Sequence, residues 1–263
     1  WQHVVKNPRM IKKLPNNKYQ IVVVGGGMVG ATFAIALSEI LESDCPPILI
    51  VEAANSENQD KFAPNYDARS TALSFGSREI LENSGIWGDL NEVVEPINEI
   101  QISDKGHFGS TRLSRKEQNV DALGYVIENS DLGAALSARL ESSFAIDFLS
   151  PGEIRKVSPT QEGMRLIIGR GGESYQVDAK LMVLADGGRS PICQQLGIQQ
   201  FRKSYEQRAV IANVSLQKPH KNIAFERFTP DGPFAMLPLR TFDDQNRCSM
   251  VCVVNEQESC LLY

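Results

Sequence analysis

Three glycines and one carboxylate near the start of the chain have the residue types and the spacing that bind a nucleotide. Gly25, Gly27 and Gly30 form a GxGxxG pattern in "IVVVGGGMVGATFAIAL", and Glu52 follows 22 residues after the last of them. Such glycines permit a tight turn and a close approach of the backbone to a pyrophosphate, while the following helix N-terminus attracts phosphate oxygens. A carboxylate at Glu52 can accept hydrogen bonds from the ribose hydroxyls of ADP. The predicted cofactor contacts on this turn are Gly25, Gly27, Met28, Val29, Gly30 and Glu52.

The elements around this turn have the order that such a site needs. Residues 19–52 read as a strand, a glycine turn, an amphipathic helix and a second strand, and "PPILIVEA" is almost continuously apolar. A continuous apolar run is typical of a parallel strand buried on both faces, so we expect a right-handed βαβ unit. Glycines that merely relieve a crowded turn are the alternative. The negative charge of Glu52 disfavours NADP here, but the pattern leaves NAD and FAD open.

A second turn follows about 160 residues later, in "VLADGGRSPICQQLG". A predicted strand delivers Asp186, then Gly187 and Gly188, and then the start of a helix. A capped strand-to-helix turn is one interpretation. The chain has no second GxGxxG and no second βαβ unit, so the other interpretation is a further contact to the same long cofactor. On this interpretation, Asp186 moves the prediction from any dinucleotide toward a long cofactor such as FAD.

Composition restricts the class of protein. The 263 residues carry a net charge of -5, with 42% hydrophobic and 22% charged residues, which is typical of a globular protein. The acidic balance argues against nucleic-acid binding, and no apolar run is long enough for a membrane span. Five cysteines without a CxxC pair predict reduced thiols in the cytoplasm, and neither they nor the three scattered histidines suggest a metal site or a hydrolase triad.

Several motifs together resemble a known family. "DARSTAL" (67–73), "ADGGRS", "YVIEN", "EQRAVIANV" and "AFERFTPDGPFAMLPL" are similar to class A flavoprotein monooxygenases, the p-hydroxybenzoate hydroxylase-like group, and within it to the ubiquinone-biosynthesis hydroxylases. The resemblance runs from about residue 19 to about residue 254. It implies FAD as the cofactor, with Asp186 and Gly187 matching the family's aspartate-glycine motif that contacts FAD. Arg69 and Asp186 would lie near the pyrophosphate and the flavin. It also places Asn129 near the cofactor, with capping of the helix that it begins as the alternative.

The same resemblance implies a reaction. NAD(P)H would serve as a transient reductant, and one oxygen atom of O2 would be transferred to the ring of a polyprenylated phenol. No catalytic acid or base is assigned. Two alternatives stay open: a NAD-linked dehydrogenase that uses only the first turn, and a non-catalytic flavoprotein fragment or assembly component.

The expected fold class is α/β, a Rossmann-like FAD-binding domain with an inserted β-rich substrate domain. The family's third flavin motif, a GDAAH-like turn, is absent, so we expect a C-terminally truncated N-terminal fragment. The predicted segments are a flexible tail (1–18), a first stretch of the FAD-binding domain (19–104), a β-rich excursion (105–122), a second stretch of the FAD-binding domain (123–200) and a partial substrate-binding sheet (201–263). Residues 70–83 have helical spacing with a stop at Gly85.

Expected partners follow from the substrate class. A polyprenylated phenol is very apolar, so the chain would meet it at a membrane surface or receive it from other ubiquinone-biosynthesis proteins. We expect a cytoplasmic protein, with peripheral contact at the inner membrane as an open alternative. The segment 225–238 is a candidate pocket wall, although Gly232 and Pro233 could simply form a turn between strands.

Overall fold

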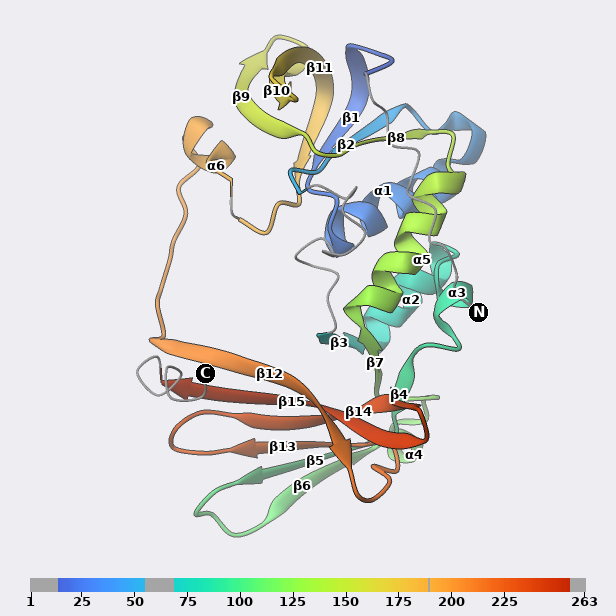
Figure 1. The fold of residues 1–263 in the computed structure, drawn as a ribbon, viewed down its shortest axis with the longest axis vertical. Helices are drawn as coiled ribbons and strands as arrows, with labels where there is room; N and C mark the ends of the chain where they lie inside the picture. Colours follow the sequence, from blue (N-terminus) through green and yellow to red (C-terminus); the bar gives the residue numbers. More distant parts are fainter. Residues whose placement is uncertain (1–13, 55–68, 189, 256–263) are drawn as a thin grey trace. The chain divides into compact units, whose positions relative to one another are not determined.

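The computed structural model describes residues 14–54, 69–188 and 190–255, and these form two compact units (Figure 1). Within the described residues, unit 1 lies in the ranges 14–54, 80–89 and 132–201, and unit 2 in the ranges 69–79, 90–131 and 202–255. Each unit is assembled from separate stretches of chain, so the predicted interruption of the nucleotide fold by β-rich insertions is confirmed. The residue ranges of the five predicted segments stay a prediction, and most of the 1–18 tail lies outside the described residues.

Unit 1 is built on a six-stranded sheet with the order β8-β2-β1-β11-β10-β9. Neighbouring strands are parallel from β8 to β11, and β9, β10 and β11 form an antiparallel meander. The strands are β1 (Lys18–Val24), β2 (Ile48–Val51), β8 (Ile146–Leu149), β9 (Glu153–Thr160), β10 (Gly163–Arg170) and β11 (Glu173–Leu184). The predicted βαβ unit is therefore present, with β1 and β2 side by side.

Helix α1 (Met28–Leu41) packs on one face of the parallel strands. Its buried side chains include Ala31, Ala34 and Ile35, and the small alanines let the helix lie close to the sheet. The other helical segments in the described chain are η1 (Glu42–Asp44), α2 (Phe75–Asn83), α3 (Trp87–Leu90), α4 (Arg115–Gln118), α5 (Asn129–Ser142) and α6 (Ile192–Gln195).

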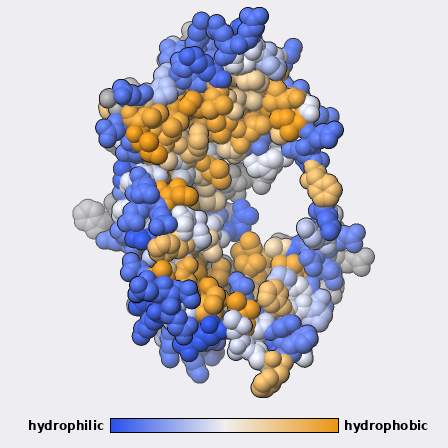
Figure 2. All heavy atoms as spheres, turned by 180° about the vertical axis from the view of Figure 1, so that it is seen from behind, coloured by the Kyte–Doolittle hydropathy of each residue, from blue (hydrophilic) through white to orange (hydrophobic). Residues whose placement is uncertain are grey.

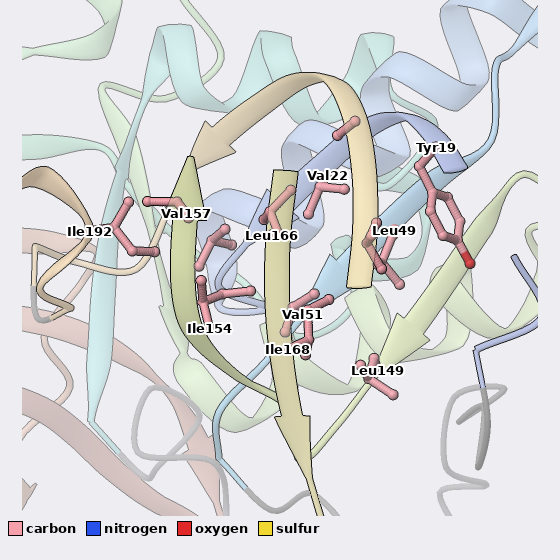
Figure 3. Close-up of a cluster of buried hydrophobic side chains, with 13 residues drawn as sticks. Tyr19, Val22, Leu49, Val51, Leu149, Ile154, Val157, Leu166, Ile168 and Ile192 are labelled. Carbon is pink, nitrogen blue, oxygen red and sulfur yellow. The ribbon is translucent and has the colours of Figure 1, made fainter. Parts of the chain in front are cut away.

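The opposite face of the parallel strands carries the main apolar cluster of unit 1 (Figure 3). Val22 and Val24 on β1 and Leu49 on β2 gather there with side chains of the meander, including Leu166 and Ile168 on β10. Side chains alternate between the two faces of a strand, so Val23 and Ile50 point toward the helix side. Burial on both faces explains why the sequence of these strands is almost continuously apolar.

Unit 2 contains a six-stranded sheet with the order β12-β15-β14-β13-β5-β6 and a small sheet with the order β3-β7-β4. The large sheet consists of β5 (Glu99–Asp104), β6 (Ser110–Ser114), β12 (Gln207–Leu216), β13 (Ile223–Phe228), β14 (Phe234–Phe242) and β15 (Gln245–Asn255), and the small sheet of β3 (Ser70–Ser74), β4 (Glu95–Ile97) and β7 (Gly124–Glu128). Strands β12 to β15 are antiparallel neighbours, which confirms the predicted second sheet.

The predicted helix over residues 70–83 is wrong in its first five residues. Residues Ser70–Ser74 form strand β3, and helix α2 begins only at Phe75. All five residues of β3 pair with β7, whose central residues are almost completely buried. Pairing with a distant strand has therefore overridden the local helical spacing, which periodicity alone cannot foresee.

Several large apolar side chains of unit 1 are exposed. Val29, Phe33 and Ile40 of α1 and Leu181 of β11 belong to this group, and hydrophobic surface gathers over unit 1 in the upper part of Figure 2. Within the described residues, no helix combines the length and the apolar character needed to cross a membrane.

Candidate functional site

The carboxyl ends of the parallel strands meet at one edge of the unit 1 sheet. The Gly25 N–H donates to the Val51 carbonyl at 2.8 Å, and the Ala185 N–H donates to the Val24 carbonyl at 2.8 Å. These bonds tie the turns after β1, β2 and β11 together. In open α/β sheets, ligands bind outside the carboxyl ends of the strands. The structure thus brings both predicted turns to the edge where a nucleotide would bind.

The first turn has no room for side chains at two of its glycines. Gly25 has a φ of 105°, and a Cβ added there would lie 2.4 Å from the Ala185 carbonyl oxygen. A Cβ on Gly30 would lie 2.0 Å from the Gly25 carbonyl oxygen. Both distances are far below any normal contact, so the turn can form only with glycine at these positions.

The N-terminus of α1 is open to an anion. Gly27 is its N-cap, no side chain caps the helix, and the first turn contains no acidic residue. The first N–H groups of a helix have no partner within it, and they carry a partial positive charge. Met28 and Val29 therefore present backbone donors beside the glycine turn. The uncapped helix end and the crowded glycines together fit a pyrophosphate.

Glu52 lies against the same turn. Its Oε2 accepts a hydrogen bond from the Gly26 N–H at 2.7 Å, and its Oε1 accepts one from the Ala54 N–H at 2.8 Å. Each carboxylate oxygen has a second acceptor position, so both can still bind a hydroxyl. Gly26 was not singled out from the sequence, although its place inside the GGG run was a signal.

The second turn lies directly beside the first. A Cβ added to Gly25 would be 3.0 Å from the Asp186 Cα, because β1 and β11 are neighbouring strands. Asp186 Oδ1 accepts from the Gly188 N–H at 2.8 Å, and Oδ2 accepts from the Ser190 hydroxyl and from the Ser190 N–H at 3.3 Å. Burial raises the pKa of Asp186, but these hydrogen bonds outweigh it and hold the pKa below its usual value.

The geometry at Asp186 also bears on the capping interpretation. Its carboxylate binds its own turn, whereas Pro191 stands at the N-cap of α6, so Asp186 does not cap that helix. Gly187 is exposed with a φ of 68°. Ser190 was not predicted from the sequence, although a hydroxyl four residues after an aspartate in a glycine turn is a recognisable partner.

Arg69 and Asn129 meet in unit 2. The Asn129 N–H donates to the Arg69 carbonyl at 2.8 Å, and the Thr71 hydroxyl donates to Asn129 Oδ1 at 2.7 Å. The Asn129 side chain is buried and joins β3, while Arg69 is exposed. The carboxamide oxygen of Asn129 therefore accepts a hydrogen bond from the neighbouring strand β3. Thr71 was not singled out from the sequence, although it stands in "DARSTAL"; Asp67 and Ala68 of that motif lie outside the described residues.

The large sheet of unit 2 has a hollow on one of its faces. Ile211, Val251, Ala235 and Glu226 stand in one row across β12, β15, β14 and β13. Directly opposed residues share a face, and so do residues two apart on one strand. The hollow holds about 210 Å³ and is lined by Glu226, Arg227, Phe228, Pro233, Phe234, Ala235, Val251 and Val253.

This hollow includes several residues of the predicted pocket wall over residues 225–238. The turn alternative also holds for its middle, since Gly232 closes a turn with Thr229 between β13 and β14. Pro233 lies both at this turn and in the wall of the hollow. Six of the eight lining residues are apolar, which suits an apolar ligand, and Glu226 and Arg227 add one charge of each sign to the lining.

Comparison with known proteins assigns the chain to a family. The FAD binding domain model matches residues 18–259. The chain is 30% identical to the ubiquinone biosynthesis monooxygenase COQ6, mitochondrial, of Rattus norvegicus over 84% of the chain and 48% of that protein. It is also 30% identical to the ubiquinone hydroxylase UbiL of Rhodospirillum rubrum over 88% of the chain and 51% of that protein. The chain therefore spans about half the length of these relatives.

Solved structures show the same fold. PqsL, a probable FAD-dependent monooxygenase from Pseudomonas aeruginosa, matches 94% of the chain and 63% of its own with a TM-score of 0.73 at 17% identity. The flavin-dependent monooxygenase PieE, solved with FAD and substrate, matches 92% of the chain and 43% of its own with a TM-score of 0.69 at 18% identity. Because the family model matches residues 18–259, which is most of the chain, the chain belongs to the FAD binding domain family.

Proposed function

We propose that this chain is the FAD-binding and substrate-binding portion of a monooxygenase that hydroxylates the ring of a polyprenylated phenol in ubiquinone biosynthesis, with NAD(P)H as reductant and O2 as the oxygen source. The observation that carries the proposal is the meeting of two turns at one sheet edge, where Gly25, Glu52 and Asp186 lie together. Two relatives at 30% identity bear ubiquinone monooxygenase or hydroxylase names, which supports the substrate class.

The proposed residue roles follow from the contacts at each turn. Met28, Val29 and the glycines of the first turn would bind the pyrophosphate through backbone N–H groups, and Glu52 would accept from the ribose. Asp186 would hold the second turn so that Gly187 presents its backbone to the cofactor. Arg69 and Asn129 are the proposed contacts from unit 2. When bound, the flavin supplies the redox chemistry and the activation of O2.

The hollow on the unit 2 sheet is the proposed site for the apolar portion of the substrate. Its lining is mostly apolar, which lets it exclude water from a prenyl chain or an aromatic ring. A prenyl chain partitions strongly into lipid, so we include in the proposal a cytoplasmic protein with peripheral contact at a membrane surface, together with substrate transfer from other ubiquinone-biosynthesis proteins. Sedimentation with lipid vesicles, with and without the substrate, tests the membrane contact.

The decisive experiment is cofactor identification. The chain, together with any residues that its gene encodes beyond it, is purified and titrated with FAD and separately with NAD, and binding is followed by the flavin absorption spectrum and by calorimetry. We expect FAD to bind and the bound flavin to be reduced by NADH or NADPH. Binding of NAD without FAD would overturn the proposal in favour of a dehydrogenase. Binding of FAD without substrate-stimulated NAD(P)H oxidation would favour a non-catalytic flavoprotein.

A further inference from the structure

One carboxylate in unit 2 joins the small sheet to the large sheet. Glu128, the last residue of β7, accepts from Arg247 Nη2 at 2.6 Å on Oε1 and from Arg247 Nη1 at 3.4 Å on Oε2. Asn213 Nδ2 also donates to Oε1 at 3.1 Å. The side chains of Arg247 and Glu128 are only 16% and 19% exposed. A partly buried, forked pair of this kind has a defined geometry, unlike a solvated surface pair.

Glu128 is adjacent to two of the proposed cofactor contacts, Arg69 and Asn129. It pairs with Ser70 across the β3–β7 ladder, so Arg69 lies next to its partner. The following residue, Asn129, donates its N–H to the Arg69 carbonyl. Any movement of the Glu128 backbone would therefore move both Arg69 and Asn129. The contacts of the Glu128 carboxylate can therefore fix the position of the segment that carries Arg69 and Asn129.

The partners of Glu128 lie on the face of the large sheet that bears the hollow. Arg247 and Val251 are four residues apart on β15, and Val251 lines the hollow. Asn213 is two residues from Ile211, which stands opposite Val251. Residues at even spacing on a strand share a face, so all of these side chains are on one side of the sheet. At about 3.3 Å per residue, Arg247 is about 13 Å along β15 from Val251.

We propose that Arg247 and Asn213 are positioning residues. Through their hydrogen bonds to Glu128, they hold the segment that carries Arg69 and Asn129 at a fixed place relative to the hollow on the large sheet of unit 2. The consequence for FAD rests on the proposed function, whereas the positioning itself does not. Lysine cannot replace Arg247 fully, because a single ammonium group lacks the fork that contacts both carboxylate oxygens. Asn213 adds a second donor that holds Oε1 from β12.

Hydrogen exchange measures the positioning without any cofactor. Arg247→Met, Arg247→Lys, Asn213→Leu and the double variant Glu128→Gln with Arg247→Met are compared with the natural chain. Arg165→Met is the matched control, because Arg165 forms an ion pair with Asp178 at 2.6 Å on the exposed surface of unit 1. We expect Arg247→Met to speed exchange of the backbone amides at residues 69–71 and 128–131 at least about tenfold. Arg247→Lys and Asn213→Leu should show smaller increases, and the double variant should add little to Arg247→Met.

FAD titration of the same variants is the second readout. We expect Arg247→Met to weaken FAD binding at least about tenfold, with partial recovery in Arg247→Lys and no change in Arg165→Met. Unchanged exchange at residues 69–71 and 128–131 would overturn the proposal. Faster exchange spread evenly over unit 2 would also overturn it. A local increase without weaker FAD binding would support the positioning and overturn its consequence for FAD. If the natural chain binds no FAD, the proposed function fails, and the exchange data still decide whether the cluster positions this segment.

Discussion

At the scale of single residues, the candidate site depends on close backbone contacts more than on reactive side chains. Gly30 is the sharpest case, because a Cβ there would collide with the Gly25 carbonyl oxygen. The carboxylates of Glu52 and Asp186 likewise stabilise the turns, since both accept hydrogen bonds from backbone N–H groups. The side chains singled out from the sequence therefore act as supports of a backbone surface that could bind a pyrophosphate.

Replacement of Gly30 by alanine tests the crowding at the first turn. We expect Gly30→Ala to lower the midpoint of thermal unfolding and to abolish FAD binding, because the Gly25 carbonyl and α1 must move apart to admit the methyl group. Circular dichroism and flavin titration measure the two effects. Gly88→Ala is the control in the same unit, since a Cβ there meets nothing within 4 Å. Equal behaviour of the two variants would contradict this explanation of the turn.

The depressed pKa of Asp186 predicts a defined pH dependence. A carboxyl group with a lower pKa in the folded state contributes stability above its ordinary pKa, and loses that contribution as the pH falls through the folded value. We expect Asp186→Asn to lower the unfolding temperature by a constant amount from neutral pH down to the ordinary range of aspartate. The difference should shrink at still lower pH. A difference that grows under acid would show that the assigned cause is wrong.

At the scale of elements, the fold of unit 1 depends on strands buried on both faces. The meander β9–β11 covers one face of β1 and β2, and α1 packs on the other. Tyr19 adds a polar tie, since its hydroxyl donates to Asp147 at 2.8 Å and so joins the start of β1 to β8. Burial, together with this hydrogen bond, raises the pKa of Tyr19 well above its usual value.

A matched pair of leucines separates core packing from surface exposure. Leu166 on β10 is fully buried in the apolar cluster, whereas Leu181 on β11 is 52% exposed. We expect Leu166→Ala to lower the free energy of unfolding by about 2 to 5 kcal/mol and Leu181→Ala to have a much smaller effect. Denaturant titrations of both variants provide the measurement. A small loss for Leu166→Ala would mean that the meander can collapse onto the space left by the side chain.

The helices and strands also differ in how well the sequence predicts them. The first turn, α1 and the acidic end of β2 could be predicted because their signal is local: glycines at fixed spacing, an apolar strand and a carboxylate. The contact between Asp186 and Gly25 was not predictable in detail, because it depends on β11 pairing beside β1. Strand β3 was missed for the same reason, since its pairing with β7 is remote in sequence. The order of the strands in each sheet determines these contacts, and that order cannot be read from a single sequence.

At the scale of the whole molecule, unit 1 cannot form from its N-terminal strands alone. A chain that ends at residue 131 would lack β8, β9, β10 and β11, which are four of the six strands of its sheet. We expect such a truncated chain to show no cooperative unfolding transition, because β1 and β2 would lose the partners that bury them. Circular dichroism with heating tests this. A cooperative transition that involves β1 would show that the pair β1–β2 is stable without its neighbours.

The long reach of the β1–β11 ladder also has a consequence for synthesis on the ribosome. Tyr19 pairs with Ala179, 160 residues further along the chain. At about 5 to 20 residues per second, β1 would wait roughly 8 to 30 seconds after emerging before its partner is made. During that interval an apolar strand with an unpaired edge is open to other chains. The strand order that brings the two turns together therefore leaves one edge of β1 without its partner until translation has passed β11.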